Sequence, residues 1–101
     1  MAFKKISKAS EIPPGTAKAF EVGSRTVCVC NIEGKFYAID DICSHAECNL
    51  NTGFIEGHDI ECECHGSRFD VRTGAVTNGP AVVPVDTFKV RMAGGDIEVD
   101  A

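Results

Sequence analysis

The sequence predicts an all-β fold, on three observations. Short stretches rich in β-forming residues recur along the chain, turn residues separate them, and no stretch keeps a helical period for more than about two turns. The chain has 101 residues, of which 44% are hydrophobic. This length suffices for one hydrophobic core, so a single domain spanning residues 1–101 is expected.

The first half of the chain predicts a meander of antiparallel strands. Residues 18–22 alternate in polarity, residues 25–32 are rich in β-formers, and residues 35–39 follow the turn signal Glu33-Gly34. Residues 10–15 contain two prolines and therefore form at most one helical turn.

The end of the chain predicts a second hairpin. Residues 87–92 and 96–99 have strand character and flank Gly94-Gly95, a typical two-residue hairpin turn. Residues 41–81 differ from both ends, because they hold all three histidines, four of the six cysteines and many Gly and Asn residues. We expect a loop-rich insertion carried by a β scaffold.

Composition excludes several classes of function. The formal net charge of −5 argues against binding to nucleic acid or to anionic membranes. The first residues resemble neither a secretory leader nor a spanning helix, so a cytoplasmic protein is expected. Cytosolic thiols are mostly reduced, which favours metal binding or redox chemistry over a disulfide-built scaffold for the cysteines.

Two short motifs combine a thiolate with an imidazole. Cys43-Ser44-His45 contains one such pair, and Cys62-Glu63-Cys64-His65 contains another, with residues 46–61 between them. Two thiolates and two imidazoles fit either a tetrahedral zinc ion or a two-iron two-sulfur cluster. Structural zinc sites usually pair ligands of one type, whereas mixed pairs suit a centre with two metals, so the cluster is favoured.

The same motifs resemble the signature of the Rieske iron-sulfur family. The similarity extends beyond these ligand pairs to Gly66-Ser67-Arg68-Phe69-Asp70, to Thr73-Gly74 and to Gly79-Pro80-Ala81, and it covers almost the whole chain. It is strongest to the Rieske ferredoxins of bacterial multicomponent aromatic-ring dioxygenases. The family's fold would give an antiparallel β-sandwich base from residues 1–40 and 82–101, and a loop-rich cluster-binding subdomain from residues 41–81.

The resemblance implies a role for each motif residue. One Rieske 2Fe-2S cluster would be bound by Cys43 and Cys62 on the inner iron and by His45 and His65 on the outer iron. Three further residues, Gly66, Ser67 and Pro80, would surround the cluster, with the Ser67 hydroxyl donating a hydrogen bond to it.

Comparison with high-potential Rieske proteins is informative at three positions, of which Cys48 and Cys64 are unusual for a dioxygenase ferredoxin. Phe69 stands where high-potential Rieske proteins carry a tyrosine hydroxyl, which predicts a low or modest reduction potential. Cys48 and Cys64 occupy the positions of a disulfide found in those high-potential proteins. The resemblance thus implies a Cys48–Cys64 disulfide, the alternative being two buried thiols.

The remaining candidate residues have structural interpretations. Cys28 and Cys30 lie two apart in a predicted strand, so both side chains point to one face, and we expect them in the core. His58 is expected to be a solvated turn residue between two short strands.

The resemblance implies a monomeric one-electron carrier rather than an enzyme. It would accept electrons from a flavin-dependent reductase and pass them to the terminal Rieske oxygenase. Three alternatives stay open: an electron-transfer subunit of another oxidoreductase such as nitrite reductase, a structural zinc module, and a Rieske domain within an oxygenase. The third is disfavoured because 101 residues leave no room for a catalytic iron domain.

Overall fold

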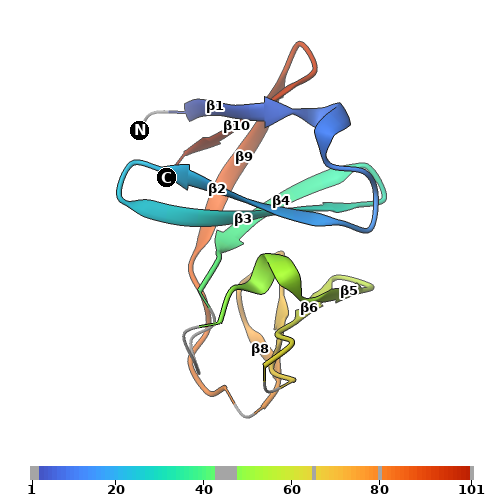
Figure 1. Ribbon diagram of the computed structural model, residues 1–101, viewed down its shortest axis with the longest axis vertical. Helices are drawn as coiled ribbons and strands as arrows, with labels where there is room; N and C mark the ends of the chain where they lie inside the picture. Colours follow the sequence, from blue (N-terminus) through green and yellow to red (C-terminus); the bar gives the residue numbers. More distant parts are fainter. Residues whose placement is uncertain (1–2, 43–47, 65, 80, 101) are drawn as a thin grey trace.

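The computed structural model describes residues 3–42, 48–64, 66–79 and 81–100, and it consists of two antiparallel sheets (Figure 1). The larger, six-stranded sheet is called the base here. Its strands, in sheet order, are β1 (Phe3–Lys8), β10 (Asp96–Asp100), β9 (Thr87–Ala93), β4 (Lys35–Asp40), β3 (Arg25–Ile32) and β2 (Ala17–Val22).

The smaller, four-stranded sheet lies at the other end of the molecule and is called the tip sheet here. Two short 3₁₀ turns, η1 (Ala9–Glu11) and η2 (Leu50–Thr52), complete the secondary structure of the described residues. The strands of the tip sheet are β5 (Phe54–Glu56), β6 (Asp59–Glu61), β7 (Arg68–Asp70) and β8 (Val76–Asn78).

Both predicted hairpins of the base are present. The turn residues Glu33 and Gly34 have φ angles of 54° and 89°, and Gly94 and Gly95 have 59° and 86°. Successive positive φ angles match the right-handed twist of the flanking strands, which explains why these two-residue signals predicted hairpins. The predicted strands agree with the observed ones to within about a residue at each end, a normal discrepancy for element boundaries.

The sequence did not predict β1. Its residues, Phe3–Lys8, include three lysines, and only Ser7 is buried, so their alternation of apolar and polar residues is weak. The strand forms by pairing with β10 at the opposite end of the chain. Because β1 and β2 are the two edges of the base and contact each other, the sheet curls into a nearly closed barrel.

Two apolar cores hold the fold together. The first fills the base and contains Ile12 and buried residues from four strands, Val22, Val27, Val29, Ala38, Ile97 and Val99. The second lies between the base and the tip sheet. It contains Cys28, Cys30, Ile32, Ile39, Leu50, Ile60, Cys62, Phe69, Val71, Ala81 and Val85. Strand β3 serves both cores because its successive side chains point to opposite faces.

Arg25 joins the two chain segments that connect the base with the rest of the molecule. Its guanidinium donates to Asp40 at 3.2 Å, where the chain leaves the base, and to Asp86 at 2.8 Å, where it returns. The Asp40 amide also donates to the Asp86 carbonyl at 2.9 Å. These contacts raise the pKa of Arg25, chiefly through the hydrogen bond to Asp86. Within the part of the chain that the structure describes, no helix is long and apolar enough to cross a membrane.

Candidate iron-sulfur site

The structure describes five of the nine predicted site residues. Cys48, Cys62, Cys64, Gly66 and Ser67 lie within it. The other four, Cys43, His45, His65 and Pro80, lie outside the described residues.

A disulfide joins Cys48 to Cys64, with Cα atoms 6.4 Å apart. It connects the chain that follows the first predicted ligand pair to the turn that carries the second pair. The sulfur atoms of Cys48, Cys62 and Cys64 all lie within 4.8 Å of one another. Cys62 is fully buried, whereas Cys64 is exposed, so the disulfide extends from beside the buried cysteine to the surface.

Cys62, the described member of the second predicted ligand pair, lies in a tight turn between β6 and β7. The Cys62 amide donates to the Ser67 carbonyl at 2.7 Å, and the Gly66 amide donates to the Cys62 carbonyl at 2.9 Å. Gly66 has a φ of +75°, a conformation that costs glycine least. The turn therefore fixes Cys62 in the interior.

Ser67 connects this turn to the segment around residue 80. Its side chain is fully buried, and its Oγ accepts a hydrogen bond from the Ala81 amide at 3.1 Å. Asn78 donates from Nδ2 to the Gly66 carbonyl at 3.2 Å. The chain on both sides of residue 80 is thus held against the turn that carries Cys62. Because the Ser67 oxygen accepts here, its hydrogen remains for donation.

These features fit a group bound by thiolates. The sulfur of Cys62 is a soft donor atom in a buried position. Backbone hydrogen bonds of the turn between β6 and β7 hold Cys62 there, and these bonds do not involve a bound metal group. The same turn supplies Ser67, a buried hydroxyl of the kind that tunes iron-sulfur centres.

Sequence reasoning missed Asp41, which is fully buried and precedes the first predicted ligand pair by two positions in the chain. Its carboxylate accepts hydrogen bonds from Asn49 and Asn51, on the other side of that pair. The available signal was an aspartate directly after an apolar strand, with two asparagines a few residues on. Such residues are usually read as solvated turn formers.

Cys28 and Cys30 belong to the core, as predicted. Both are fully buried, and their sulfur atoms lie 3.8 Å apart. The hydrogen bond to Cys30, together with burial, raises the pKa of Cys28 well above its usual value. Such a thiol is unreactive at neutral pH.

His58 is exposed in the turn between β5 and β6, as predicted, but it also contacts the base. Its ring meets the ring of Tyr37 edge to face, with centroids 6.2 Å apart. Its carbonyl accepts a hydrogen bond from the Val71 amide at 2.9 Å. His58 therefore helps to seat the tip sheet on the base.

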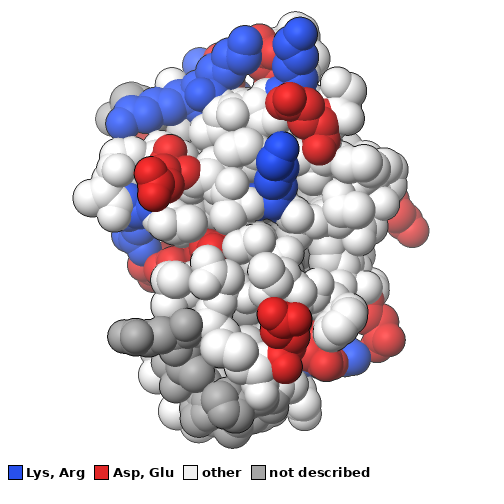
Figure 2. Space-filling view, viewed as in Figure 1, with Lys and Arg blue, Asp and Glu red and all other residues white. Residues whose placement is uncertain are grey.

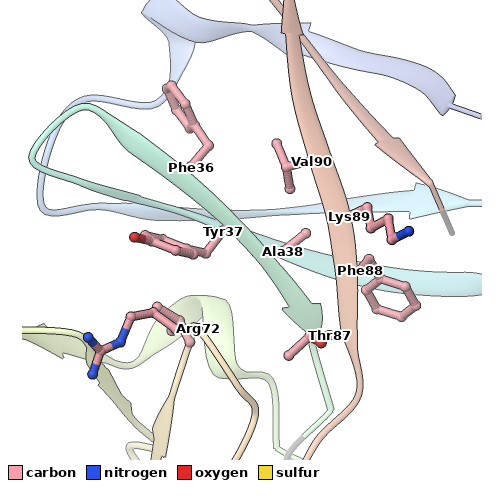
Figure 3. Close-up of a pocket in the computed structure, with 9 residues that line it drawn as sticks. Phe36, Tyr37, Ala38, Arg72, Thr87, Phe88, Lys89 and Val90 are labelled. Carbon is pink, nitrogen blue, oxygen red and sulfur yellow. The ribbon is translucent and has the colours of Figure 1, made fainter.

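A groove of about 480 Å³ lies where β4 and β9 diverge (Figure 3). Among the described residues, β4 and β9 are paired at two positions, Ala38 with Phe88 and Ile39 with Thr87. Figure 3 shows Phe36 and Val90 facing the gap above this pairing, with Arg72 at the opposite end. None of the described site residues lines the groove, so it is separate from the candidate site.

The negative charge is concentrated in the half that carries the candidate site. Residues 41–81 contain seven acidic residues and only two basic ones, whereas the rest of the chain contains eight of each. Figure 2 shows the lysines and arginines mostly over the base, while acidic side chains predominate on the described surface of the other half. The net charge of −5 therefore belongs to the half with the predicted cluster ligands.

One arginine organises part of this acidic surface. Arg68 of β7 donates to Glu61 of β6 at 2.8 Å and to Glu56 of β5 at 2.9 Å. These bonds, that to Glu56 first, raise the pKa of Arg68. Glu63, in the turn beside Cys62, is exposed and forms no salt bridge with a described residue.

Comparison with known proteins places the chain in a family. Residues 2–89 match the Rieske [2Fe-2S] domain family. The ferredoxin component of biphenyl 2,3-dioxygenase from Rhodococcus jostii (strain RHA1) is 42% identical over 100 residues, which cover 99% of this chain and 94% of that protein.

Solved structures of dioxygenase ferredoxins are also similar to this chain. The ferredoxin of carbazole 1,9a-dioxygenase from Nocardioides aromaticivorans IC177 has a TM-score of 0.94 and 38% identity, covering 98% of this chain and 97% of its own. A chain in the complex of reduced oxygenase and oxidized ferredoxin of carbazole 1,9a-dioxygenase has a TM-score of 0.91 and 35% identity, with coverages of 96% and 91%. Nitrite reductase small subunits match at only 14–16% identity, which shows the fold alone.

The family match covers most of the chain, and the ferredoxin relatives match it over nearly their full length. Such a family member carries one 2Fe-2S cluster. The chain therefore belongs to the Rieske [2Fe-2S] family, as a ferredoxin component of aromatic ring-hydroxylating dioxygenase systems that transfers electrons and is not itself an enzyme.

Proposed function

We propose that this ferredoxin carries single electrons from a flavin-dependent reductase to the terminal Rieske oxygenase of an aromatic-ring dioxygenase. One observation carries the proposal: the turn holding Cys62 is tied by a disulfide to the end of the first ligand loop and by Ser67 to the segment around residue 80. Three chain segments thus converge on one buried thiolate, in a chain whose relatives are dioxygenase ferredoxins.

We assign the cluster ligands as Cys43 and Cys62 on the inner iron and His45 and His65 on the outer iron. The bound cluster supplies one-electron chemistry at a potential set by its ligands and by nearby hydrogen bonds. The described residues support this assignment through the burial of Cys62 and through the closeness of its sulfur to that of Cys48, which follows His45 by three positions in the chain. Gly66, Ser67 and Pro80 are proposed to enclose the cluster.

The hydrogen bonds around Cys62 suit a low or modest potential. Ser67 can donate to the site, whereas Phe69 is fully buried and has no hydroxyl to offer. A donor to a sulfur ligand stabilises the reduced state, so a site with one such donor has a lower potential than a site with two.

The acidic half of the molecule is proposed to guide docking. A surface with seven acidic and two basic residues favours a basic patch on the partner, and complementary charge speeds encounter more than it tightens the complex. Two exposed apolar residues, Val82 and Val83, follow the segment around residue 80 and offer uncharged contact area at this end. A small, transient interface suits a monomeric carrier that must release each partner.

We place this exchange in the cytoplasm, where reduced nicotinamide cofactors supply flavin-dependent reductases. The same surface is proposed to meet the reductase and the oxygenase in turn, because one end of the molecule carries the ligands.

Stopped-flow electron transfer tests the function. The reduced ferredoxin, mixed anaerobically with an oxidised terminal dioxygenase, should be reoxidised while the Rieske centre of the oxygenase is bleached. A nitrite reductase large subunit serves as the control acceptor. Transfer to the control acceptor with none to any aromatic-ring oxygenase would overturn the proposal.

A further inference from the structure

Asp41 is the one fully buried carboxylate among the described residues. It lies directly after β4 and two positions before Cys43, so it stands at the point where the chain leaves the base for the first ligand pair. Burial of a carboxylate is costly unless hydrogen bonds compensate for the lost water. The residues that donate hydrogen bonds to the Asp41 carboxylate therefore indicate its role.

Four hydrogen bonds meet the carboxylate, all from residues beyond the first ligand pair. Asn49 donates from Nδ2 to Oδ2 at 2.6 Å. Asn51 donates from its amide to Oδ1 at 2.9 Å, and its Nδ2 lies 2.8 Å from Oδ1 and 2.9 Å from Oδ2. None of these donors is a cation, and Asp41 forms no salt bridge with a described residue.

Backbone hydrogen bonds also join the chain on the two sides of residues 43–47, which is called the loop closure here. The Leu50 amide donates to the Asp41 carbonyl at 2.6 Å, and Ile42 and Asn49 form an isolated antiparallel bridge. The Asp41 amide donates to the Thr26 carbonyl at 3.1 Å, which ties the closure to the base. The two ends of the segment from residue 43 to residue 47 are thus fixed to each other and to β3.

We propose that Asp41 is the positioning residue for the first ligand pair, and that its buried charge holds the reduction potential of the cluster down. The inference rests on the proposed assignment of Cys43 and His45 as ligands. Asp41 fixes the spacing of the loop ends through Asn49 and Asn51, and its charge, which the neutral amide donors do not cancel, opposes the addition of an electron to the cluster.

The two roles can be separated by variants. Asp41→Asn keeps the side-chain shape, removes the charge and loses acceptor capacity. Asn51→Ala removes the Nδ2 donor of that residue, leaves its backbone amide and Asn49 as donors, and keeps the charge. Glu63→Gln is the matched control, because it removes an exposed carboxylate beside Cys62 that takes no part in the closure.

Each purified, cluster-loaded variant is measured for iron release to a ferrous chelator, for reduction potential and for far-ultraviolet circular dichroism. Asp41→Asn and Asn51→Ala should both release iron about 10- to 100-fold faster than the parent protein, the usual cost of removing a residue that orients metal ligands. Only Asp41→Asn should also raise the potential by clearly more than Glu63→Gln. Glu63→Gln should release iron at the parent rate.

Parent-like iron release from both Asp41→Asn and Asn51→Ala would overturn the positioning role. A potential in Asp41→Asn no higher than in Glu63→Gln would overturn the electrostatic role. If Asp41→Asn fails to fold, Asn51→Ala alone tests the positioning role. The double variant Asn49→Ala and Asn51→Ala then replaces Asp41→Asn in the measurement of the reduction potential. Because it keeps the Asp41 charge and removes the side-chain donors, its potential should be lower than that of the parent protein. A parent protein without a Rieske spectrum would refute the proposed function instead.

Discussion

Cys48 and Cys64 are bonded to each other across the candidate site, so the end of the first ligand loop and the turn of the second are one covalent unit. The bond closes a loop with a sequence separation of 16. Its exposed half, Cys64, is accessible to reductants, while the adjacent Cys62 is buried.

Replacing both disulfide cysteines by serine should lower the free energy of unfolding by about 3 kcal/mol, because a cross-link of this loop length restricts the unfolded chain. Urea unfolding followed by circular dichroism measures the effect. The parent protein in excess dithiothreitol is the matched control and should shift toward the variant. An equal unfolding midpoint for parent and variant would show that the bond contributes nothing to stability.

Gly74 should not tolerate a side chain. It has a φ of +80°, and a Cβ at this position would collide with the Val85 carbonyl oxygen. The Val85 amide also donates to the Gly74 carbonyl at 2.9 Å, so the two segments cannot easily separate. Gly74→Ala should destabilise the fold by roughly 2–4 kcal/mol in urea unfolding.

The control is Gly57→Ala. Gly57 has a similar φ of +62° but open space around it, so only the backbone strain applies and the loss should be about 1 kcal/mol. Equal losses at both positions would mean that the collision with Val85 is relieved without cost.

Ser67 should raise the reduction potential of the cluster. Its hydroxyl oxygen accepts from the Ala81 amide, which leaves its hydrogen to donate to the site. Ser67→Ala should therefore lower the potential in a redox titration, while Phe69→Tyr, which adds a hydroxyl in the adjacent strand β7, should raise it. Potentials that move in the opposite directions would contradict these hydrogen-bonding roles.

Charge reversal near Cys62 should slow docking. Glu63→Lys should reduce the second-order rate of electron transfer to the oxygenase by about threefold to tenfold at low ionic strength, because it weakens electrostatic steering. Added salt should shrink the difference. Glu21→Lys, the same change on an exposed position of β2 in the base, is the control and should have little effect. An equal loss of transfer rate in both variants would show that docking does not depend on the charge near Cys62.

The sequence predicted the elements whose signals are local. Glu33-Gly34 and Gly94-Gly95 specify two-residue turns by themselves, and Cys28 and Cys30 reveal a buried face by their spacing in a strand. Strand β1 gave no such signal, because its stability comes from pairing with β10 at the far end of the chain.

The ligand assignment stays a prediction, because Cys43, His45 and His65 lie outside the described residues. The spacing of the Cys and His pairs suggested the ligands, and resemblance supplied the disulfide partners. Asp41 was missed because a buried carboxylate and a solvated one look alike in sequence. Only the fold brings Asn49 and Asn51 to its two oxygens.

The central claim is that one cluster is bound by two cysteines and two histidines, Cys43, Cys62, His45 and His65. Pulsed electron paramagnetic resonance of the reduced protein, with and without ¹⁵N-histidine labelling, tests this most directly. The account predicts a rhombic signal with strong coupling to two histidine nitrogens. A signal without histidine coupling, as from an all-cysteine cluster, or a colourless protein containing zinc would contradict it.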